Sequence, residues 1–577
     1  MKLIALVIKQ YDKLFKEQIF NFSDEYKVNF DFETNELKID ENPDYIENFY
    51  GESIYNITPI VGINGSGKST LLELIRDLGK NSASHLENNN SCFKVFKKDN
   101  EKFKVKQYNM TVRENENFEI NGDDGLPQEI NVNTTISYFN LHNQTFRGVT
   151  GVAENSNILE MAINWSPLEN YYKVYSEFYS KEIFSDFKFK ISLTRSYFFP
   201  DSLTQALDNK KELIKEVCLT LITNIRDKIF GTLGETNKEK GESLAGLDSI
   251  LAQIADYKSE DKDDWESDIK FYENKMKDLD DAFYLLKEGF YDVSFFEVFQ
   301  RISSVLFLFK NYIIGIENEK IIVEFPRDLS QNQNFLKICK KFDSLCEFLN
   351  RYSHLGLSIL NFDSFCMSAG EINFIRLFSN ALFSQQQFND IKDYIFLIDE
   401  IEMGMHLEWS RKLIDNFIEF LKRKRQREDV SLQLVFTTHS PYMLSDIKPG
   451  NVIMLEKNQK TGYSEGKVLQ NTFAKNIQEI MKENLIDNIY GDFALAKINS
   501  MIDRLNGEEK QEGNEDEKLL REIHLISEPI LRNKLLEMYD KKYKTVESSI
   551  DKQLNQLNLD AQQRTQVRKM IEENNKK

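Results

Sequence analysis

GINGSGKS, residues 62–69, is the stretch that decides the fold, because it fits the pattern G-x-x-x-x-G-K-[ST] in full. An apolar run, Ile57–Val61, precedes it, and a helical pattern with apolar residues on one face follows. Glycines let backbone N–H groups curl around phosphate oxygens, and the N-terminus of the next helix directs positive partial charge toward them. The sequence therefore predicts a phosphate-binding loop between a strand and a helix.

The polar positions of this loop have expected roles with ATP and Mg²⁺. Lys68 should reach the β- and γ-phosphates, and the hydroxyl of Ser69 should ligate Mg²⁺. The residues expected to contact the nucleotide in this segment are Gly62, Asn64, Gly65, Ser66, Gly67, Lys68, Ser69 and Thr70.

Two acids follow a second apolar run. Tyr394–Ile398 is nearly all apolar, as a buried parallel strand should be, and Asp399 and Glu400 stand at its C-terminal end. Ligands bind at this end of parallel sheets. We expect Asp399 to hold Mg²⁺ through water and Glu400 to act as the general base that orients the attacking water. Such a pair also occurs as a strand-end cap, and the loop at 62–69 favours the catalytic interpretation.

Two short polar segments stand around these acids. SAGE, residues 368–371, opens a predicted helix that ends near Leu382; alone it would be a capping motif, and a helix N-terminus can also bind an anion. THSP, residues 438–441, follows a predicted strand, Leu432–Thr437. His439 at that place can hydrogen-bond a γ-phosphate or the attacking water, although a lone histidine is more often structural.

The order of these four motifs, with a long insertion after the first, resembles the SMC, RecF and OLD branch of ABC-type ATPases. The resemblance implies an α/β P-loop NTPase fold in which two lobes form one nucleotide-binding domain, with a large helical insertion and a helical C-terminal region. It implies ATP hydrolysis with Glu400 and His439 in the catalytic site. It also implies a dimer in which Ser368 and Gly370 of one protomer contact the γ-phosphate bound by the other.

The sequence departs from this family pattern at two places. Ala369 stands where the signature usually has its second glycine, and Leu407 replaces the proline of the OLD-type stretch DE-x-E-x-x-x-H-P. In this class a glutamine that helps to hold Mg²⁺ should follow the predicted strand Thr134–Phe139. The best candidate for this glutamine is Gln144, and the next candidates are Asn140 and Asn143.

Periodicity divides the chain into four predicted parts. Residues 1–150 carry short alternating strands and the phosphate-binding loop, and residues 151–355 form a mostly helical insertion. The α/β pattern returns over residues 356–470 with the signature, the two acids and the histidine. Residues 471–577 are again helical.

Two charged segments interrupt the helical parts. Asp256–Glu288 is rich in charge with few apolar positions, which predicts a solvated helical hairpin or a short coiled coil. Gly507–Lys518 is expected to be a disordered loop.

Composition excludes several classes of protein. The net charge of −19 argues against a DNA-coating protein, although a local basic patch could still contact phosphate. One basic run, Lys422–Arg427, ends a predicted helix, where cations complement the helix dipole or could contact nucleic acid. No apolar run reaches the roughly 18 residues that a bilayer requires. The N-terminal residues predict a first strand rather than a signal peptide, so we expect a cytoplasmic protein without a membrane partner.

The C-terminal region resembles ATPase subunits of bacterial anti-phage systems, on the segments Thr472–Ile477 and Ile526–Leu531. Septu-type systems, and some retrons, pair such an ATPase with a separate HNH nuclease. We see neither a D-x-D after Val452–Leu455 nor an HNH histidine cluster, so nuclease activity is not expected of this chain. The leading hypothesis is an ATPase sensor that gates a partner nuclease. A RecF-like DNA-repair ATPase and a low-turnover ATP-binding scaffold are the alternatives.

Overall fold

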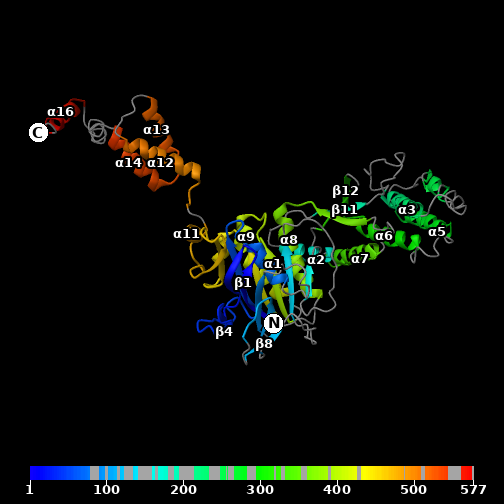
Figure 1. Ribbon diagram of the computed structural model, residues 1–577. Coiled ribbons are helices and arrows are strands. Elements are labelled where there is room, and N and C mark those ends of the chain that lie inside the picture. Colours follow the sequence, from blue (N-terminus) through cyan, green and yellow to red (C-terminus); the bar gives the residue numbers. More distant parts are fainter. Residues whose placement is uncertain are drawn as a thin grey trace. The chain divides into compact units, whose positions relative to one another are not determined.

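In the computed structural model the chain divides into two compact units, Met1–Ile480 and Met481–Lys577. The ribbon is coloured along the sequence in Figure 1. The structure describes residues 1–77, 90–97, 102–113, 117–121, 134–140, 159–162, 167–179, 188–193, 213–232, 247, 249–254, 256–257, 265–282, 294–317, 320–326, 332–351, 360–387, 392–424, 430–485, 488–507, 514–543 and 561–574.

The central sheet of the first unit has the strand order β10-β9-β15-β16-β5-β17-β18. Its strands pair in parallel, except that β18 runs antiparallel to β17. The strand β16 therefore lies between β5, which leads into the phosphate-binding loop, and β15, which ends in the two acids. The bounds are β5 Ile54–Gly62, β9 Thr134–Asn140, β10 Leu159–Ala162, β15 Asp393–Asp399, β16 Ser431–Thr437, β17 Val452–Lys457 and β18 Ser464–Leu469.

Helices pack on this sheet through apolar faces that the sequence predicts. α1 begins at the loop lysine, contacts β5, β15 and β16, and buries Leu71, Leu72 and Ile75 completely. Each such side chain contributes about 1.5–3 kcal/mol by leaving water. The helices α1, α8 and α9 are labelled around the sheet in Figure 1. Their bounds are α1 Lys68–Asp77, α8 Ala369–Gln387, α9 Leu407–Lys424, α10 Pro441–Leu444 and α11 Ile477–Asn484.

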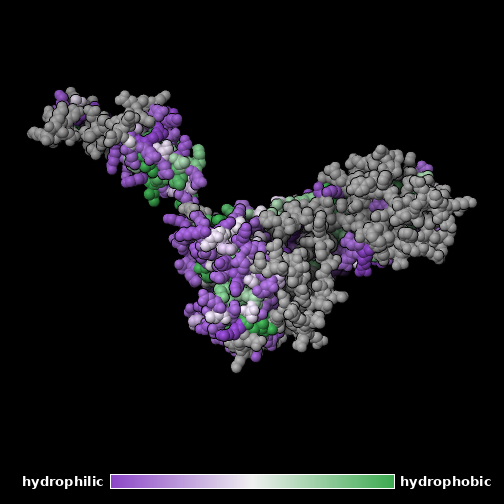
Figure 2. Space-filling model, in the orientation of Figure 1, coloured by the Kyte–Doolittle hydropathy of each residue, from purple (hydrophilic) through white to green (hydrophobic). Residues whose placement is uncertain are grey.

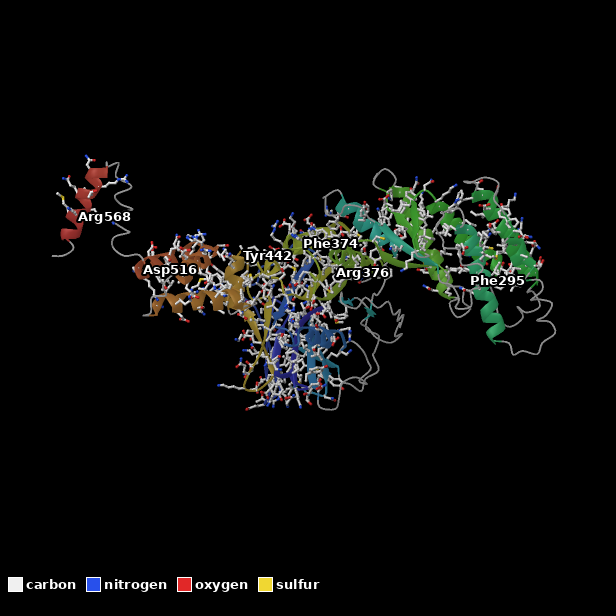
Figure 3. The ribbon with its side chains drawn as sticks, turned by 90° about the horizontal axis from the view of Figure 1, so that it is seen from above. Phe295, Phe374, Arg376, Tyr442, Asp516 and Arg568 are labelled. Atoms are coloured by element: carbon white, nitrogen blue, oxygen red, sulfur yellow. The ribbon has the colours of Figure 1, made fainter. Side chains whose placement is uncertain are left out.

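An aromatic cluster joins α8 to its neighbours. Phe374 stacks on Phe378 with ring centroids 4.4 Å apart, and both rings meet Phe178 of α2 edge-on. Phe374 is labelled on α8 in Figure 3. Trp409 of α9 also meets Phe374 edge-on, with ring centroids 5.8 Å apart. The N-terminal turn of α8 is therefore fixed by packing on α2 and α9.

A second sheet, of order β2-β1-β6-β7-β8, lies beside the first. Gln433 of β16 joins the two, because its buried amide accepts from the backbone N–H of Leu3 and donates to the carbonyls of Leu3 and Phe22. The strands predicted near the N-terminus are present. Their bounds are β1 Lys2–Tyr11, β2 Phe15–Asn21, β6 Ser91–Lys97, β7 Phe103–Tyr108 and β8 Phe118–Asn121, with the hairpin β3 Tyr26–Asp31 and β4 Glu36–Glu41.

The insertion contains helices, as predicted, but its strands β11, β12 and β13 also form a sheet of order β12-β13-β11-β14 with β14 from the part that follows, and this sheet was not predicted from the sequence. Its strands have only five or six residues each, and short alternating runs inside a helical, Lys-rich segment give little periodicity to detect. The bounds are α2 Leu168–Tyr179, β11 Lys188–Leu193, α3 Leu213–Thr232, α5 Trp265–Ala282, α6 Phe295–Phe309, β12 Ile313–Glu317, β13 Lys320–Glu324, α7 Asn332–Arg351 and β14 Leu360–Phe365.

The charged segment at 256–288 forms α5 over its described residues. α5 packs against both α3 and α6 and buries Trp265, Tyr272 and Met276. It is thus one member of a helical bundle, with its apolar stripe turned inward.

The second unit has its own small core. Met501, Leu505, Leu519, Ile523 and Leu535 are buried between its helices. Hydrophobic surface on this unit is also visible in Figure 2. Its helices are α12 Asp492–Asn506, α13 Asn514–His524, α14 Pro529–Tyr543 and α16 Ala561–Asn574.

The prediction of a disordered loop at 507–518 is wrong for residues 514–518. Residues 514–518 form the first turn of α13, while residues 508–513 lie outside the described part of the chain. The acids Glu515, Asp516 and Glu517 stand where a helix dipole favours negative charge, and this explains why so polar a segment is helical.

Candidate nucleotide-binding site

The loop at 62–69 has the backbone that its glycines predict. Gly62, Gly65 and Gly67 all have positive φ, at 149°, 78° and 96°. A Cβ atom on Gly62 would lie 2.4 Å from the carbonyl oxygen of Leu455, and one on Gly67 would lie 2.9 Å from Phe15 Cζ. Both positions are therefore restricted to glycine by conformation and by space.

Lys68 folds back onto its own loop. Its ammonium donates to the carbonyls of Gly62 and Ile63, at 3.0 and 3.2 Å, and the side chain is buried. Burial lowers the pKa of Lys68, and the carboxylates of Glu400, Asp399 and Glu402 oppose that effect. The lysine thus lies within the field of three acids from the segment after β15.

Asp399 joins the loop to the sheet. Its Oδ1 accepts from Ser69 Oγ at 3.0 Å and from Thr437 Oγ1 at 2.7 Å, and only 3% of the residue is exposed. The two donors come from α1 and from the end of β16. Three segments that are far apart in the sequence therefore meet at one carboxylate.

Glu400 begins a turn directly after this carboxylate. Its φ is +50°, which is unusual for a residue with a side chain, and its N–H donates to Thr437 Oγ1 at 2.7 Å. The hydroxyl of Thr437 thus contacts both acids: it donates to the carboxylate of Asp399 and accepts from the backbone N–H of Glu400. The sequence predicts Thr437 only as the end of a strand; a threonine that closes an apolar run is the signal that could have identified its role.

The signature segment forms a capping box at the start of α8. Ser368 N and Oγ both donate to Glu371 Oε2, at 2.9 and 2.7 Å, and Ser368 is exposed. Gly370 lies so close to the turn after Glu400 that a Cβ atom would fall 2.3 Å from the Gly404 carbonyl oxygen. Asn373 Nδ2 donates to the Met403 carbonyl at 2.9 Å. The signature helix is therefore bonded and packed onto the turn that follows the two acids.

The histidine segment is fixed through its backbone. The N–H groups of His439 and Ser440 both donate to Glu402 Oε1, at 2.7 and 3.0 Å, while His439 itself is exposed. Thr438 N donates to the carbonyl of Ile60 at 3.2 Å, which ties the segment to β5 as well. Glu402 is the second glutamate of the stretch that resembles DE-x-E-x-x-x-H-P, but the sequence does not predict its contacts, because its partners are backbone groups 37 and 38 residues away.

The glutamine expected near Mg²⁺ falls outside the described residues, since Gln144 and Asn143 lie in the stretch 141–158. Asn140 is the last residue of β9, and its Cα lies in register with that of Asp399 on β15. β9 therefore ends at the same edge of the sheet as β15.

Two cations of the basic run are paired with an acid of the insertion. Arg423 and Lys424 lie 3.0 and 2.8 Å from the two carboxylate oxygens of Glu177 on α2. These cations therefore attach α9 to α2 in addition to complementing the dipole of α9.

A scan of family models confirms what this geometry indicates. Residues 31–444, well over half of the chain, match the family described as the AAA ATPase domain. The chain belongs to the AAA ATPase domain family. The matched residues include the phosphate-binding loop, the signature helix, both acids and His439, and the predicted α/β P-loop fold is confirmed.

Other comparisons with known proteins add little to the assignment of this chain to the AAA ATPase domain family. No curated protein matches the chain. Among solved structures, the Smc head domain with an extended coiled coil, bound to the C-terminal domain of ScpA and derived from Pyrococcus furiosus, is 11% identical. The match covers 83% of this chain and 98% of that one, with a TM-score of 0.22. None of the helices that the structure describes combines the length and apolar character that a bilayer crossing requires.

The contact between Gly370 and Gly404 leads to a first prediction. Gly370→Ala should lower the melting temperature and slow ATP turnover, because the added Cβ cannot fit 2.3 Å from a carbonyl oxygen without moving the turn or the helix. Overpacking of this kind costs about 1–3 kcal/mol. Gly315→Ala is the matched control, since its Cβ would meet nothing within 4 Å. Thermal unfolding and steady-state phosphate release measure both effects, and parent-like behaviour of Gly370→Ala would contradict the prediction.

Proposed function

We propose that this chain binds ATP and Mg²⁺ at residues 62–70 and hydrolyses the ATP. The observation that carries the proposal is the 3.0 Å contact between Ser69 Oγ and Asp399 Oδ1, which joins residues 330 apart in the sequence. Mg²⁺ prefers oxygen ligands. When phosphates supply some of them, the protein contributes only a few, such as a hydroxyl and a carboxylate oxygen. Ser69 and Asp399 would hold the ion, which neutralises phosphate charge when bound.

The chain's own groups divide the remaining work. The backbone N–H groups of the loop and the N-terminus of α1 face the phosphates, and Lys68 exchanges its two carbonyl partners for phosphate oxygens. Glu400, next to the buried Asp399, is placed to orient water and accept its proton. His439 stands at the end of the neighbouring strand, where an exposed imidazole can donate to the γ-phosphate or to that water.

This proposal predicts that binding and hydrolysis can be separated. Lys68→Ala should abolish tight ATP binding, because the phosphate charge loses its cationic partner. Glu400→Gln should keep ATP affinity and lose turnover by about 10²-fold or more, since the amide preserves the shape but cannot accept a proton. Isothermal calorimetry and phosphate release distinguish the two variants. Equal ATP affinity in Lys68→Ala and the parent, or parent-rate hydrolysis by Glu400→Gln, would refute these roles.

We further propose that the active form is a dimer with shared sites. The exposure of Ser368 at the N-terminus of α8 supports this, and in a dimer its hydroxyl would exchange Glu371 Oε2 for an oxygen of the γ-phosphate. The close packing of Gly370 brings the backbone of the signature onto the turn after Glu400. In this arrangement Ser368 and Gly370 would close on the γ-phosphate held by the other protomer.

Mixing two inactive variants tests the shared site. Ser368→Arg should bind ATP but not hydrolyse it, because a bulky cation stands where a small hydroxyl must close on phosphate. Combined with Lys68→Ala, it gives mixed dimers with one site carrying both lesions and one carrying neither. Phosphate release should therefore partly return in the mixture. If Ser368→Arg alone hydrolyses ATP at the parent rate, Ser368 is only a helix cap.

The finer biological role that we propose is an ATP-dependent sensor that gates a separate nuclease of the HNH type in anti-phage defence. One observation favours a gating role for the C-terminal region. Thr472 Oγ1 donates to the Ile447 carbonyl and Ala474 N to the Ser445 carbonyl, at 2.8 Å each. Residues 445–447 come directly after α10, which follows His439. A shift of the histidine segment would thus reach the chain that leads into the second unit.

The gating proposal predicts a division of activities between two proteins. The purified chain with ATP, Mg²⁺ or Mn²⁺ and plasmid should leave the plasmid intact. Addition of an HNH nuclease encoded beside it should give cleavage that depends on ATP and disappears with Lys68→Ala. Cleavage by the chain alone that survives Lys68→Ala would show a nuclease site in this chain. ATP-dependent binding to DNA ends without any nuclease partner would favour the repair alternative.

A further inference from the structure

The histidine segment is held by one side chain from another part of the site. Glu402 Oε1 accepts from both His439 N and Ser440 N, at 2.7 and 3.0 Å. Ser440 N also donates to Thr438 Oγ1 at 2.9 Å, which is a bond within the segment itself. Glu402 is thus the side chain that crosses from the turn after β15 to the end of β16 and fixes two consecutive backbone N–H groups.

The turn that carries Glu402 is itself rigidly placed. Met403 N donates to the Glu400 carbonyl and Met405 N to the Glu402 carbonyl, at 2.9 Å each. On its other side the turn packs against α8, through the 2.9 Å bond from Asn373 Nδ2 to the Met403 carbonyl. The carboxylate of Glu402 is therefore not free to follow the histidine segment; instead it holds the segment against a fixed frame.

The electrostatics of Glu402 favour this holding role. Burial raises the pKa of Glu402, and the hydrogen bonds from the backbone of His439 and from Thr438 oppose that effect. When ionised, a carboxylate that accepts two N–H groups makes charge-assisted bonds, which are about twice as strong as neutral ones. Glu402 also lies close enough to Lys68 to favour its charged form. The hydrogen bonds of Glu402 thus go to the backbone of the histidine segment, while its charge also acts on Lys68.

We propose that Glu402 is a positioning residue that sets the place of His439 by holding the backbone of residues 439 and 440. The proposal rests on the proposed ATPase function, because it assigns the place of a group at that site. In this arrangement Glu402 does not touch the nucleotide. It acts through His439, whose imidazole is the group presented to the γ-phosphate or the water. The turn at 400–405 thereby links the histidine segment on one side to the signature helix on the other.

Three variants test the role in catalysis. Glu402→Ala should lower kcat about tenfold or more, as expected when a catalytic group loses its position, while the Kd for ATP changes less than about twofold. Glu402→Gln keeps an oxygen that can accept the two N–H groups and should retain kcat within about threefold of the parent. Glu408→Ala, an exposed acid on α9 paired with Arg411 and Lys412, is the matched control and should behave as the parent. Equal loss of kcat in Glu402→Gln and Glu402→Ala would show that an accepting oxygen at this position does not sustain turnover, and would overturn the proposal.

A double-mutant cycle tests whether Glu402 acts through the histidine. In a His439→Ala background, Glu402→Ala should lower kcat by less than about twofold further, since the group it positions is already gone. A full additional tenfold loss would show that Glu402 acts on something else, and parent-rate hydrolysis by Glu402→Ala alone would equally reject the proposal.

Hydrogen–deuterium exchange tests the hydrogen bonds between Glu402 and the backbone of residues 439 and 440 in the absence of nucleotide. The peptide covering residues 436–442 should exchange faster in Glu402→Ala than in the parent, in Glu402→Gln or in Glu408→Ala, because two amide N–H groups lose their acceptor. Unchanged exchange would overturn the proposal. This measurement also separates the two proposals: absence of ATP hydrolysis in the parent would reject the proposed function, whereas the exchange result depends only on the contact between Glu402 and the backbone.

Discussion

The buried carboxylate of Asp399 is the constraint on which the site depends. A carboxylate that is 3% exposed is costly unless its oxygens are bonded, and here Ser69 and Thr437 donate to it. Those two donors fix the start of α1 and the end of β16 relative to β15. Thr437 in turn accepts from the backbone N–H of Glu400, so that one hydroxyl fixes the positions of both acids. The loop, the two acids and the histidine segment are brought to one edge of the sheet by these bonds.

The turn at 400–405 extends this arrangement in two directions. Glu402 reaches the backbone of the histidine segment, and Met403 and Gly404 meet the first turn of the signature helix. The absence of a side chain at Gly370 permits that approach. The histidine segment and the signature helix are therefore connected through six consecutive residues of the chain, 400–405.

The rest of the first unit holds this edge in place. The buried amide of Gln433 binds the N-terminal sheet to β16, and the aromatic cluster around Phe374 fixes α8 against α2 and α9. Glu177 of α2 pairs with the cations at the end of α9. Helix α2 of the insertion thus contacts both α8 and α9. A displacement of α8 would therefore move the signature segment and change the packing of α8 on α2 of the insertion.

The sequence by itself determined the phosphate-binding loop, the buried strands that frame it, the acids at the end of β15 and the α/β P-loop fold. These follow from local chemistry, since glycine spacing, apolar runs and strand-end acids act within a few residues of one another. Only the tertiary structure decided that Thr437 serves both acids, that Glu402 holds the backbone at 439 and 440, and that Gly370 faces Gly404. It also decided that three strands of the insertion pair with β14 in a four-stranded sheet. These contacts join segments tens to hundreds of residues apart, and no local period records which of them will meet.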